Sequence, residues 1–287
     1  MKSLSALLLA AFVIASCSRH DSNNSAVDSG KKNKSIFQQD SRKISIDVEK
    51  TGSLSPDNEF IRKHMAKFYS DYVPGSDCWM LVKAPDTDLN YCMEIKRVND
   101  VMINNSPHKF VEINGLYVNH KGFVDPDNAP HVAGGKSGFY VFAKNNNDWQ
   151  LIEKIVEFNS ETWGRSGVDE KSFSQFGPAV HGWKISDGGM WQGQIYESTI
   201  FVAFINGKLI KILDFPITYN ADGYGSEDFI KKNFTNVLEV DKSKIANNLY
   251  VLHLTFKNKD IDKNYEIKFD SKSNAYLYPN ELPGIDY

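Results

Sequence analysis

A glycine-rich stretch of the sequence, FGPAVHGWKISDGGMWQGQIYES over residues 176–198, gathers side chains that could bind or react. Trp183 and Trp191 offer large amphipathic surfaces of the kind that dominate protein interfaces and sugar-stacking sites. Gln192 and Gln194 add hydrogen-bonding groups, and glycines allow a partner to approach the backbone closely. The alternative is that the tryptophans belong to the core and the glycines to sheet turns. The candidate binding surface comprises His181, Trp183, Asp187, Trp191, Gln192 and Gln194.

The same stretch contains a candidate acid/base pair, His181 and Asp187. Acid/base catalysis needs such groups within reach of one substrate, and usually a further group that orients them. The sequence marks no third partner. It also lacks the Gly-x-Ser-x-Gly elbow of serine hydrolases and the His-Glu-x-x-His motif of metalloproteases. We therefore name no catalytic residue.

A second polar cluster lies in HKGFVDPDNAPH, and its members are His120, Asp125, Asp127 and His131. Imidazole and carboxylate groups bind zinc and other divalent ions. The spacing follows no known metal template, however, and Asp-Pro-Asp-Asn is ordinary turn chemistry. Residues 220–228, NADGYGSED, lack the regular Asp spacing of a calcium loop. We expect no metal site and no cofactor.

The elements that must position these residues follow β patterns. Four stretches carry apolar runs around turn signals, which is typical of antiparallel hairpins. They are 108–119 with a turn at Asn114-Gly115, 138–156 with a four-residue polar loop, 199–213 with a turn at Asn206-Gly207, and 249–270. A short helix is a further candidate at 226–238.

One stronger helix is predicted before these hairpins. Ser55 is a suitable N-cap and Pro56 a suitable first helical residue. The apolar residues that then recur at helical spacing are Phe60, Ile61, Met65, Phe68, Tyr69 and Tyr72, and Pro74-Gly75 ends the run. The pattern predicts an α+β fold, mainly antiparallel β hairpins with one N-terminal helix, in one or two β-rich subdomains.

The first residues of the chain resemble the signal of bacterial lipoprotein precursors. Lys2 is followed by an apolar run, Leu4 to Ala15, which is shorter than the about 20 residues that span a bilayer. The run ends in IASC, which is similar to a lipobox. The resemblance implies that residues 1–16 are removed and that Cys17 becomes the acylated, palmitate-bearing N-terminus. The alternative is an ordinary secretory signal with an incidental cysteine.

Ser18, the residue after the predicted lipidation site, is typical of lipoproteins sorted to the outer membrane. We therefore expect the protein to face the periplasm, held by its lipid anchor. Export to an oxidising compartment favours a disulfide between Cys78 and Cys92, which lie on either side of a turn signal at Pro85. Two strands that meet at this turn would place the cysteines opposite each other. The alternative is two free buried thiols.

The composition limits the kinds of partner. The chain carries a formal net charge of −3, and loss of Lys2 with the signal makes it one unit more negative. This acidity argues against nucleic acid as a partner. A polar, Ser- and Asn-rich segment after Cys17 has almost nothing to bury and is typical of a flexible tether.

The chain is thus expected to have four parts. These are a signal peptide (1–16), a tether (17–52), a helix with a disulfide-pinned antiparallel sheet (53–158) and a mainly β subdomain (159–287). The favoured function is a lipid-anchored module that binds an envelope protein, either an assembly partner or a toxin. The alternatives are an envelope enzyme acting on cell-wall material and a structural lipoprotein without a discrete site.

Overall fold

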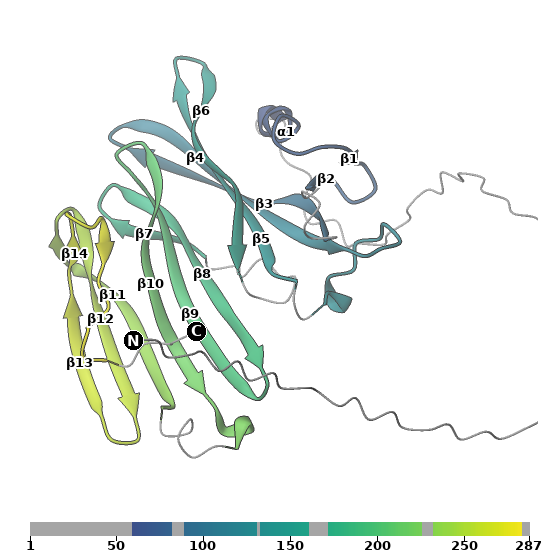
Figure 1. The fold of residues 1–287 in the computed structure, drawn as a ribbon. Helices are drawn as coiled ribbons and strands as arrows, with labels where there is room; N and C mark the ends of the chain where they lie inside the picture. The colour runs from purple at the N-terminus through teal and green to yellow at the C-terminus, as the bar shows by residue number, and fades with distance from the viewer. Residues whose placement is uncertain (1–58, 82–88, 131–132, 161–171, 226–231, 283–287) are drawn as a thin grey trace, which may run out of the picture. The chain divides into compact units, whose positions relative to one another are not determined.

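The computed structural model describes residues 59–81, 89–130, 133–160, 172–225 and 232–282. Over these residues the protein is mostly antiparallel β-sheet with a single short α-helix, α1 (Glu59–Met65) (Figure 1). The predicted hairpin architecture is confirmed, whereas the term α+β overstates the helical share.

No helix in the described part of the chain is both long and apolar enough to cross a membrane.

The first sheet has six strands whose order in space is their order in the chain. They are β1 (Tyr72–Val73), β2 (Cys78–Leu81), β3 (Asn90–Ile103), β4 (Ser106–Val118), β5 (Gly135–Asn145) and β6 (Asp148–Ser160). All neighbouring strands are antiparallel. A short 3₁₀ turn, η2 (Pro126–Asn128), lies between β4 and β5.

The second sheet has seven strands and also follows chain order. They are β7 (Phe173–Gly177), β8 (Val180–Trp191), β9 (Gln194–Ile205), β10 (Lys208–Asn220), β11 (Phe234–Ala246), β12 (Leu249–Asn258) and β13 (Asp262–Ile267). A 3₁₀ turn, η3 (Asp222–Tyr224), follows β10. The small strands β14 (Phe269–Asp270) and β15 (Ala275–Tyr276) pair with each other.

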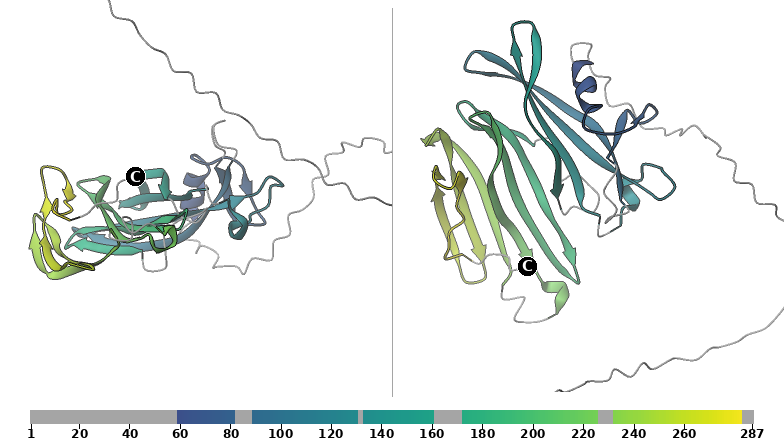
Figure 2. Two further views of the ribbon diagram at one scale, coloured as in Figure 1. Left: turned by 60° about the horizontal axis from the view of Figure 1, so that its bottom comes forward. Right: turned by 45° about the horizontal axis from the view of Figure 1, so that its top comes forward.

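Helix α1 lies over one face of the first sheet (Figure 2). A hydrophobic cluster joins residues of this helix to residues of the sheet. Ile61, Met65 and the nearby Tyr69 are buried there against Tyr140 of β5. The Tyr140 hydroxyl donates a 2.9 Å hydrogen bond to the Tyr69 hydroxyl, which donates one of 2.8 Å to the carbonyl of Val156. Burial raises the pKa of both tyrosines, so that both hydroxyls keep their protons.

The opposite face of the first sheet packs against the second sheet. Strand alternation places Phe110 of β4 with Phe139 and Val141 of β5 on this face. Trp183 of β8 and Val202 of β9 belong to the same cluster. Residues from both sheets therefore share a continuous hydrophobic core.

The second sheet bends between β10 and β11. Among the described residues, the two strands pair only at Thr218 with Thr235 and at Tyr219 with Phe234. Strand β7, at the far edge, also contacts β11 and β12. The two halves of this sheet therefore face each other across a third hydrophobic cluster.

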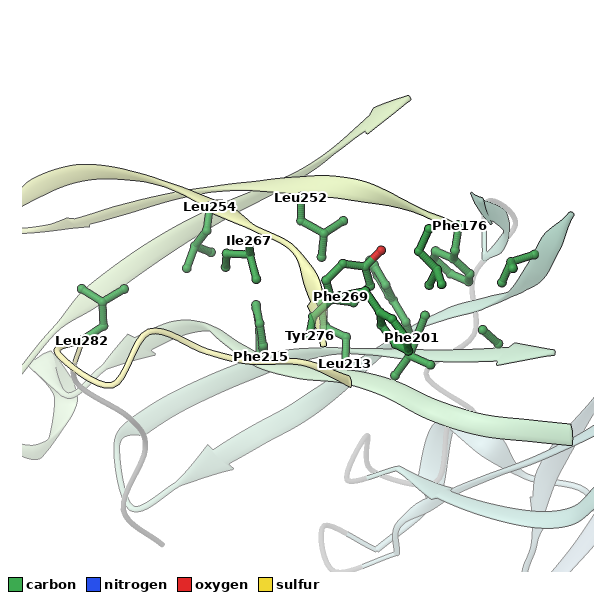
Figure 3. Close-up of a cluster of buried hydrophobic side chains, with 14 of the residues drawn as sticks. Phe176, Phe201, Leu213, Phe215, Leu252, Leu254, Ile267, Phe269, Tyr276 and Leu282 are labelled. Atoms are coloured by element: carbon green, nitrogen blue, oxygen red, sulfur yellow. The ribbon is translucent and has the colours of Figure 1, made fainter. Parts of the chain in front are cut away.

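The residues of this third cluster are shown in Figure 3, where Leu252, Leu254 and Ile267 face Phe215 and Leu213. The C-terminal segment, residues 269–282, completes it. Phe269, Tyr276 and Leu282 are buried in the cluster. The Tyr276 hydroxyl donates a 2.5 Å hydrogen bond to the carbonyl of Tyr250, and Asn236 Nδ2 donates to the carbonyl of Pro216 and to the Tyr278 hydroxyl.

The predicted turn at Asn114-Gly115 is wrong, because β4 runs straight through it. Gly115 pairs with Met93 on one side and Lys136 on the other. A Cβ on Gly115 would lie 2.7 Å from Lys136 Cβ and 2.9 Å from Met93 Sδ. The glycine therefore serves close approach of neighbouring strands, and the hairpin turns at Asn104-Asn105 instead.

Other local predictions have mixed outcomes. The turn at Asn206-Gly207 is confirmed, as is the β12–β13 hairpin. The β5–β6 hairpin is also confirmed, but its turn has two residues, Asn146 and Asn147. The helix is shorter than predicted, since α1 ends at Met65 and Tyr72 lies in β1. The possible helix at 226–238 is wrong from Phe234 onward, where β11 begins.

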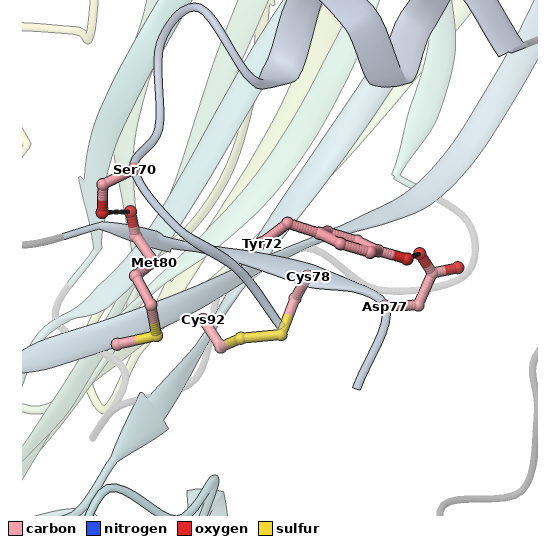
Figure 4. The surroundings of a disulfide bond; sticks show 6 residues. All are labelled: Ser70, Tyr72, Asp77, Cys78, Met80 and Cys92. Carbon is pink, nitrogen blue, oxygen red and sulfur yellow. Dashed lines mark hydrogen bonds between the residues drawn. A yellow bond between two sulfur atoms is a disulfide. The ribbon is translucent and has the colours of Figure 1, made fainter. Parts of the chain in front are cut away.

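The predicted disulfide between Cys78 and Cys92 is present, with Cα atoms 5.5 Å apart and both residues fully buried (Figure 4). The cysteines are not directly opposite each other. Cys78 pairs with Glu94 and Cys92 with Met80, so the bond crosses β2 and β3 diagonally.

An ion pair beside the disulfide joins α1 to the turn between β1 and β2. Arg62 holds both carboxylate oxygens of Asp77, at 2.5 and 2.6 Å, and the Tyr72 hydroxyl donates a 2.7 Å hydrogen bond to the same group. The Arg62 guanidinium lowers the pKa of Asp77. This bidentate contact and the disulfide both fix the start of the first sheet.

The predicted signal peptide, the tether and the N-cap at Ser55 lie outside the described residues. The chain leaves the first sheet at Ser160 and enters the second at Phe173. The predicted division into 53–158 and 159–287 remains a prediction.

Candidate functional site

The candidate residues of the glycine-rich stretch lie on one hairpin of the second sheet. His181, Trp183, Asp187 and Trp191 belong to β8, Gln192 lies in the turn, and Gln194 begins β9. In a strand, successive side chains point to opposite faces of the sheet. His181, Trp183 and Asp187 are separated by even numbers of positions in an unbroken register, so alternation assigns their side chains to one face of β8.

Trp183 was predicted as part of a binding surface, and the structure places it in the core. Its side chain is 0% exposed. Its ring centroid lies 4.5 Å from that of Phe139 and 5.6 Å from that of Phe110, both in the first sheet. The reason is alternation, because Trp183 shares with Ile185 the face that packs against that sheet. The side chain of Trp191 lies outside the described part of the structure.

Two glycines of the stretch serve the sheet. A Cβ at Gly182 would collide with the carbonyl oxygen of Val202 on β9. A Cβ at Gly188 would collide with that of Tyr196, and Gly188 has a φ of 141°, which side chains rarely adopt. These glycines permit strand pairing, so a ligand is not needed to explain them.

The two members of the proposed acid/base pair are far apart. His181 and Asp187 are six positions apart along β8, which corresponds to about 20 Å in an extended strand. His181 is half-buried, with its ring stacked on Phe173, and burial lowers its pKa, with Lys242 adding to the effect. The two groups cannot act on the same substrate atom.

The cavity that does form on this hairpin, here called the hairpin cavity, lies near the β8–β9 turn. Its volume is about 570 Å³. Cross-strand pairing sets Met190 beside Ile195 and Gly188 beside Glu197, and Ile217 of β10 completes an apolar lining. The side chains of Met190 and Ile195 are 46% and 39% exposed.

Charged and polar groups surround this apolar lining. Lys184 and Glu197 are exposed residues of the cavity wall, and Asp187 is half-buried beside them. Of the predicted surface residues whose side chains the structure describes, only Asp187 lines the cavity. Met190, Ile195 and Ile217 were not among the predicted site residues, although GMWQGQI does place two apolar residues symmetrically about a turn.

The two glutamines of the predicted surface lie at the rim of the hairpin. Gln192 is exposed in the turn with a φ of 49°. Gln194 Oε1 accepts a 3.1 Å hydrogen bond from the Tyr219 hydroxyl of β10. Gln194 thus joins β9 to β10 at this end of the sheet.

The polar cluster at 120–131 lies in the loop between β4 and β5. Asp125 accepts hydrogen bonds of 2.8 Å from Asn128 and 3.2 Å from Asn119. These bonds lower the pKa of the Asp125 carboxyl group and hold the turn. His131 lies outside the described residues. Where the structure describes the chain, no three His, Cys, Asp or Glu side chains gather in a group that could hold a metal ion.

A comparison of the chain with known protein families, curated proteins and solved structures found no match.

Proposed function

We propose that the protein is a lipid-anchored protein of the bacterial cell envelope that binds another envelope protein through the hairpin cavity. The observation that carries the proposal is the pair of exposed apolar side chains, Met190 and Ile195, in an open cavity of about 570 Å³. Contiguous exposed apolar surface on a soluble domain is typical of sites that contact a partner.

The chemistry of the lining supports a protein partner. Protein interfaces combine an apolar centre with a polar rim. In the hairpin cavity Met190, Ile195 and Ile217 form the apolar part, and Lys184 and Glu197 offer both signs of charge beside it. An apolar anchor residue of the partner, flanked by polar residues, would complement this arrangement. The flexible thioether of Met190 can adapt to the shape of such an anchor.

The test is capture of a partner from envelope extract by the purified protein. The variant Met190→Glu places a charge in the apolar centre and should abolish capture of a stoichiometric partner. Its matched control is Met102→Glu, because Met102 is also an exposed strand methionine, 62% exposed, but lies in β3 of the first sheet. Equal capture by both variants, or no partner with the unmodified protein, would contradict the proposal.

The anchor needs its own test. The expected outcome for the full-length chain is that it partitions into detergent and incorporates labelled palmitate, whereas a Cys17→Ser variant does neither. A single acyl chain binds a protein to a membrane only marginally, so stable anchoring needs a second acyl chain or another membrane-binding feature. Retention of label in Cys17→Ser would contradict lipidation at Cys17.

A further inference from the structure

A second and larger cavity, here called the turn cavity, lies where several hairpin turns of both sheets meet. Its volume is about 850 Å³. The turns are β3–β4, β7–β8, β9–β10 and β11–β12, and the segment between β14 and β15 completes the wall. None of its described lining residues belongs to the hairpin cavity, so it is a separate site.

The lining of the turn cavity is uncharged. Its described residues include no Asp, Glu, Lys or Arg. The one titratable side chain is His108, whose Nδ1 lies 2.8 Å from the carbonyl oxygen of Ser106. A carbonyl accepts, so Nδ1 donates the proton and, in the neutral ring, Nε2 is an acceptor. A charged ligand would lose its hydration here without gaining a counter-charge.

Side-chain amides form part of the cavity lining. Asn104, Asn206, Asn248 and Asn274 line the cavity from four different turns. Their φ angles are 49°, 50°, 65° and 55°, a conformation that asparagine and glycine tolerate best. Each amide is exposed and offers a donor and an acceptor that no other group of the described chain uses. The positive φ of each turn explains why an asparagine occupies each of these positions. The four asparagines line one cavity because the turns of the two sheets meet there.

The inner wall is apolar. Val180, Phe204, Leu249 and Phe269 line the cavity and are all largely buried. A purely apolar ligand would cover this wall but leave the amides without partners. The ligand that satisfies both parts is uncharged, rich in hydroxyl or amide groups, and has apolar C–H faces.

We propose that the turn cavity binds an uncharged oligosaccharide. Sugar hydroxyls both donate and accept hydrogen bonds, as the asparagine amides do, and a sugar ring presents C–H groups to an apolar wall. The volume of about 850 Å³ is in the usual range for ligand sites, roughly 300–1,000 Å³. This site is independent of the proposed protein-binding function.

The test measures binding of three trisaccharides to the full-length protein by titration calorimetry. The probes are tri-N-acetylchitotriose and maltotriose, which are uncharged, and trigalacturonic acid, which is anionic. We expect one of the neutral probes to bind at least tenfold more tightly than the anionic one. Binding of neither neutral probe, or tighter binding of trigalacturonic acid, would overturn the proposal.

The site is located with variants that keep the turns intact. The double variant Asn206→Gly with Asn248→Gly removes two amides while glycine retains the positive φ, and it should weaken binding at least tenfold. The matched control is Asn146→Gly, since Asn146 also has a positive φ, 54°, but lies in the β5–β6 turn away from the cavity. Unchanged binding in the double variant, or equal loss in the control, would overturn the assignment. Should the double variant unfold at a lower temperature, the single variant Asn274→Gly decides by the same criteria.

Discussion

Trp183 illustrates how strand position, more than residue type, decides the role of a side chain. A tryptophan is suited both to a core and to an interface. Here the period of two along β8 turns Trp183 toward the aromatic rings of the first sheet. The position of a single side chain therefore depended on which face of the strand became buried.

Replacement of Trp183 by alanine should lower the free energy of unfolding by about 3–5 kcal/mol, because it leaves a large cavity between the two sheets. Urea denaturation measures this change. Phe123→Ala is the control, since Phe123 is 47% exposed and should change stability by no more than about 0.5 kcal/mol. Equal stability of the two variants would mean that Trp183 is not packed in the core.

His181 should make the protein less stable in mild acid. Burial lowers its pKa below the ordinary value of 6.5, and the nearby positive charge of Lys242 adds to the effect. The unfolded chain therefore binds this proton more readily than the folded one. Stability from His181 is complete above pH 6.5 and is lost as the pH falls through the depressed folded-state pKa.

The variant His181→Gln removes this titration, so its urea midpoint should fall less between pH 8 and pH 5 than that of the unmodified protein. The control His120→Gln changes an exposed loop histidine and should keep the full pH dependence. The same loss in all three proteins would exclude His181 as the source.

At the scale of elements, the disulfide connects β2 to β3, two strands that pair over only a short length. Strand β2 has four residues, and the cysteines are separated by 14 positions. Closing a loop of this size is worth about 3 kcal/mol in the chain-entropy model. The double variant Cys78→Ala with Cys92→Ala should therefore unfold at a lower urea concentration.

Dithiothreitol gives the matched measurement for this prediction. It should destabilise the unmodified protein by about the same 3 kcal/mol and leave the double variant unchanged. A double variant that still responds to dithiothreitol would show that the effect does not come from this bond.

The two Asn-Gly pairs show how far local sequence predicts these elements. Asn206-Gly207 makes the expected turn, with φ angles of 50° and 80°. Asn114-Gly115 has the same residues and flanking apolar runs, yet it lies within β4 between two paired strands. Local propensity was the same in both cases, and the lateral neighbours of β4 decided the difference.

At the scale of the whole molecule, the C-terminal segment closes the bent second sheet. Strands β10 and β11 pair at one end only, so they diverge along the rest of their length. Residues 269–282 cover the third cluster between them, and removal of this segment would expose the cluster to solvent. A chain that ends at Lys268 should therefore lose cooperative unfolding of this sheet and bind more of a dye for exposed apolar surface.

Single substitutions within the segment provide the control for this truncation. Tyr276→Ala removes a residue that is 3% exposed and should cost several kcal/mol, whereas Leu277→Ala alters one that is 55% exposed and should be nearly neutral. Comparable stability of the truncated and full chains would contradict the closing role.

The sequence by itself determined the local features of this protein: the hairpin pattern, the turn at Asn206-Gly207, the short helix and the Cys78–Cys92 pair. These depend on residue types and spacings within short stretches of the chain, such as the 14 positions that separate the two cysteines. Tertiary structure decided the burial of Trp183, the separation of His181 from Asp187, and both cavities. Each of these depends on which strands lie side by side and which face becomes covered, and that is set by contacts between residues distant in the chain.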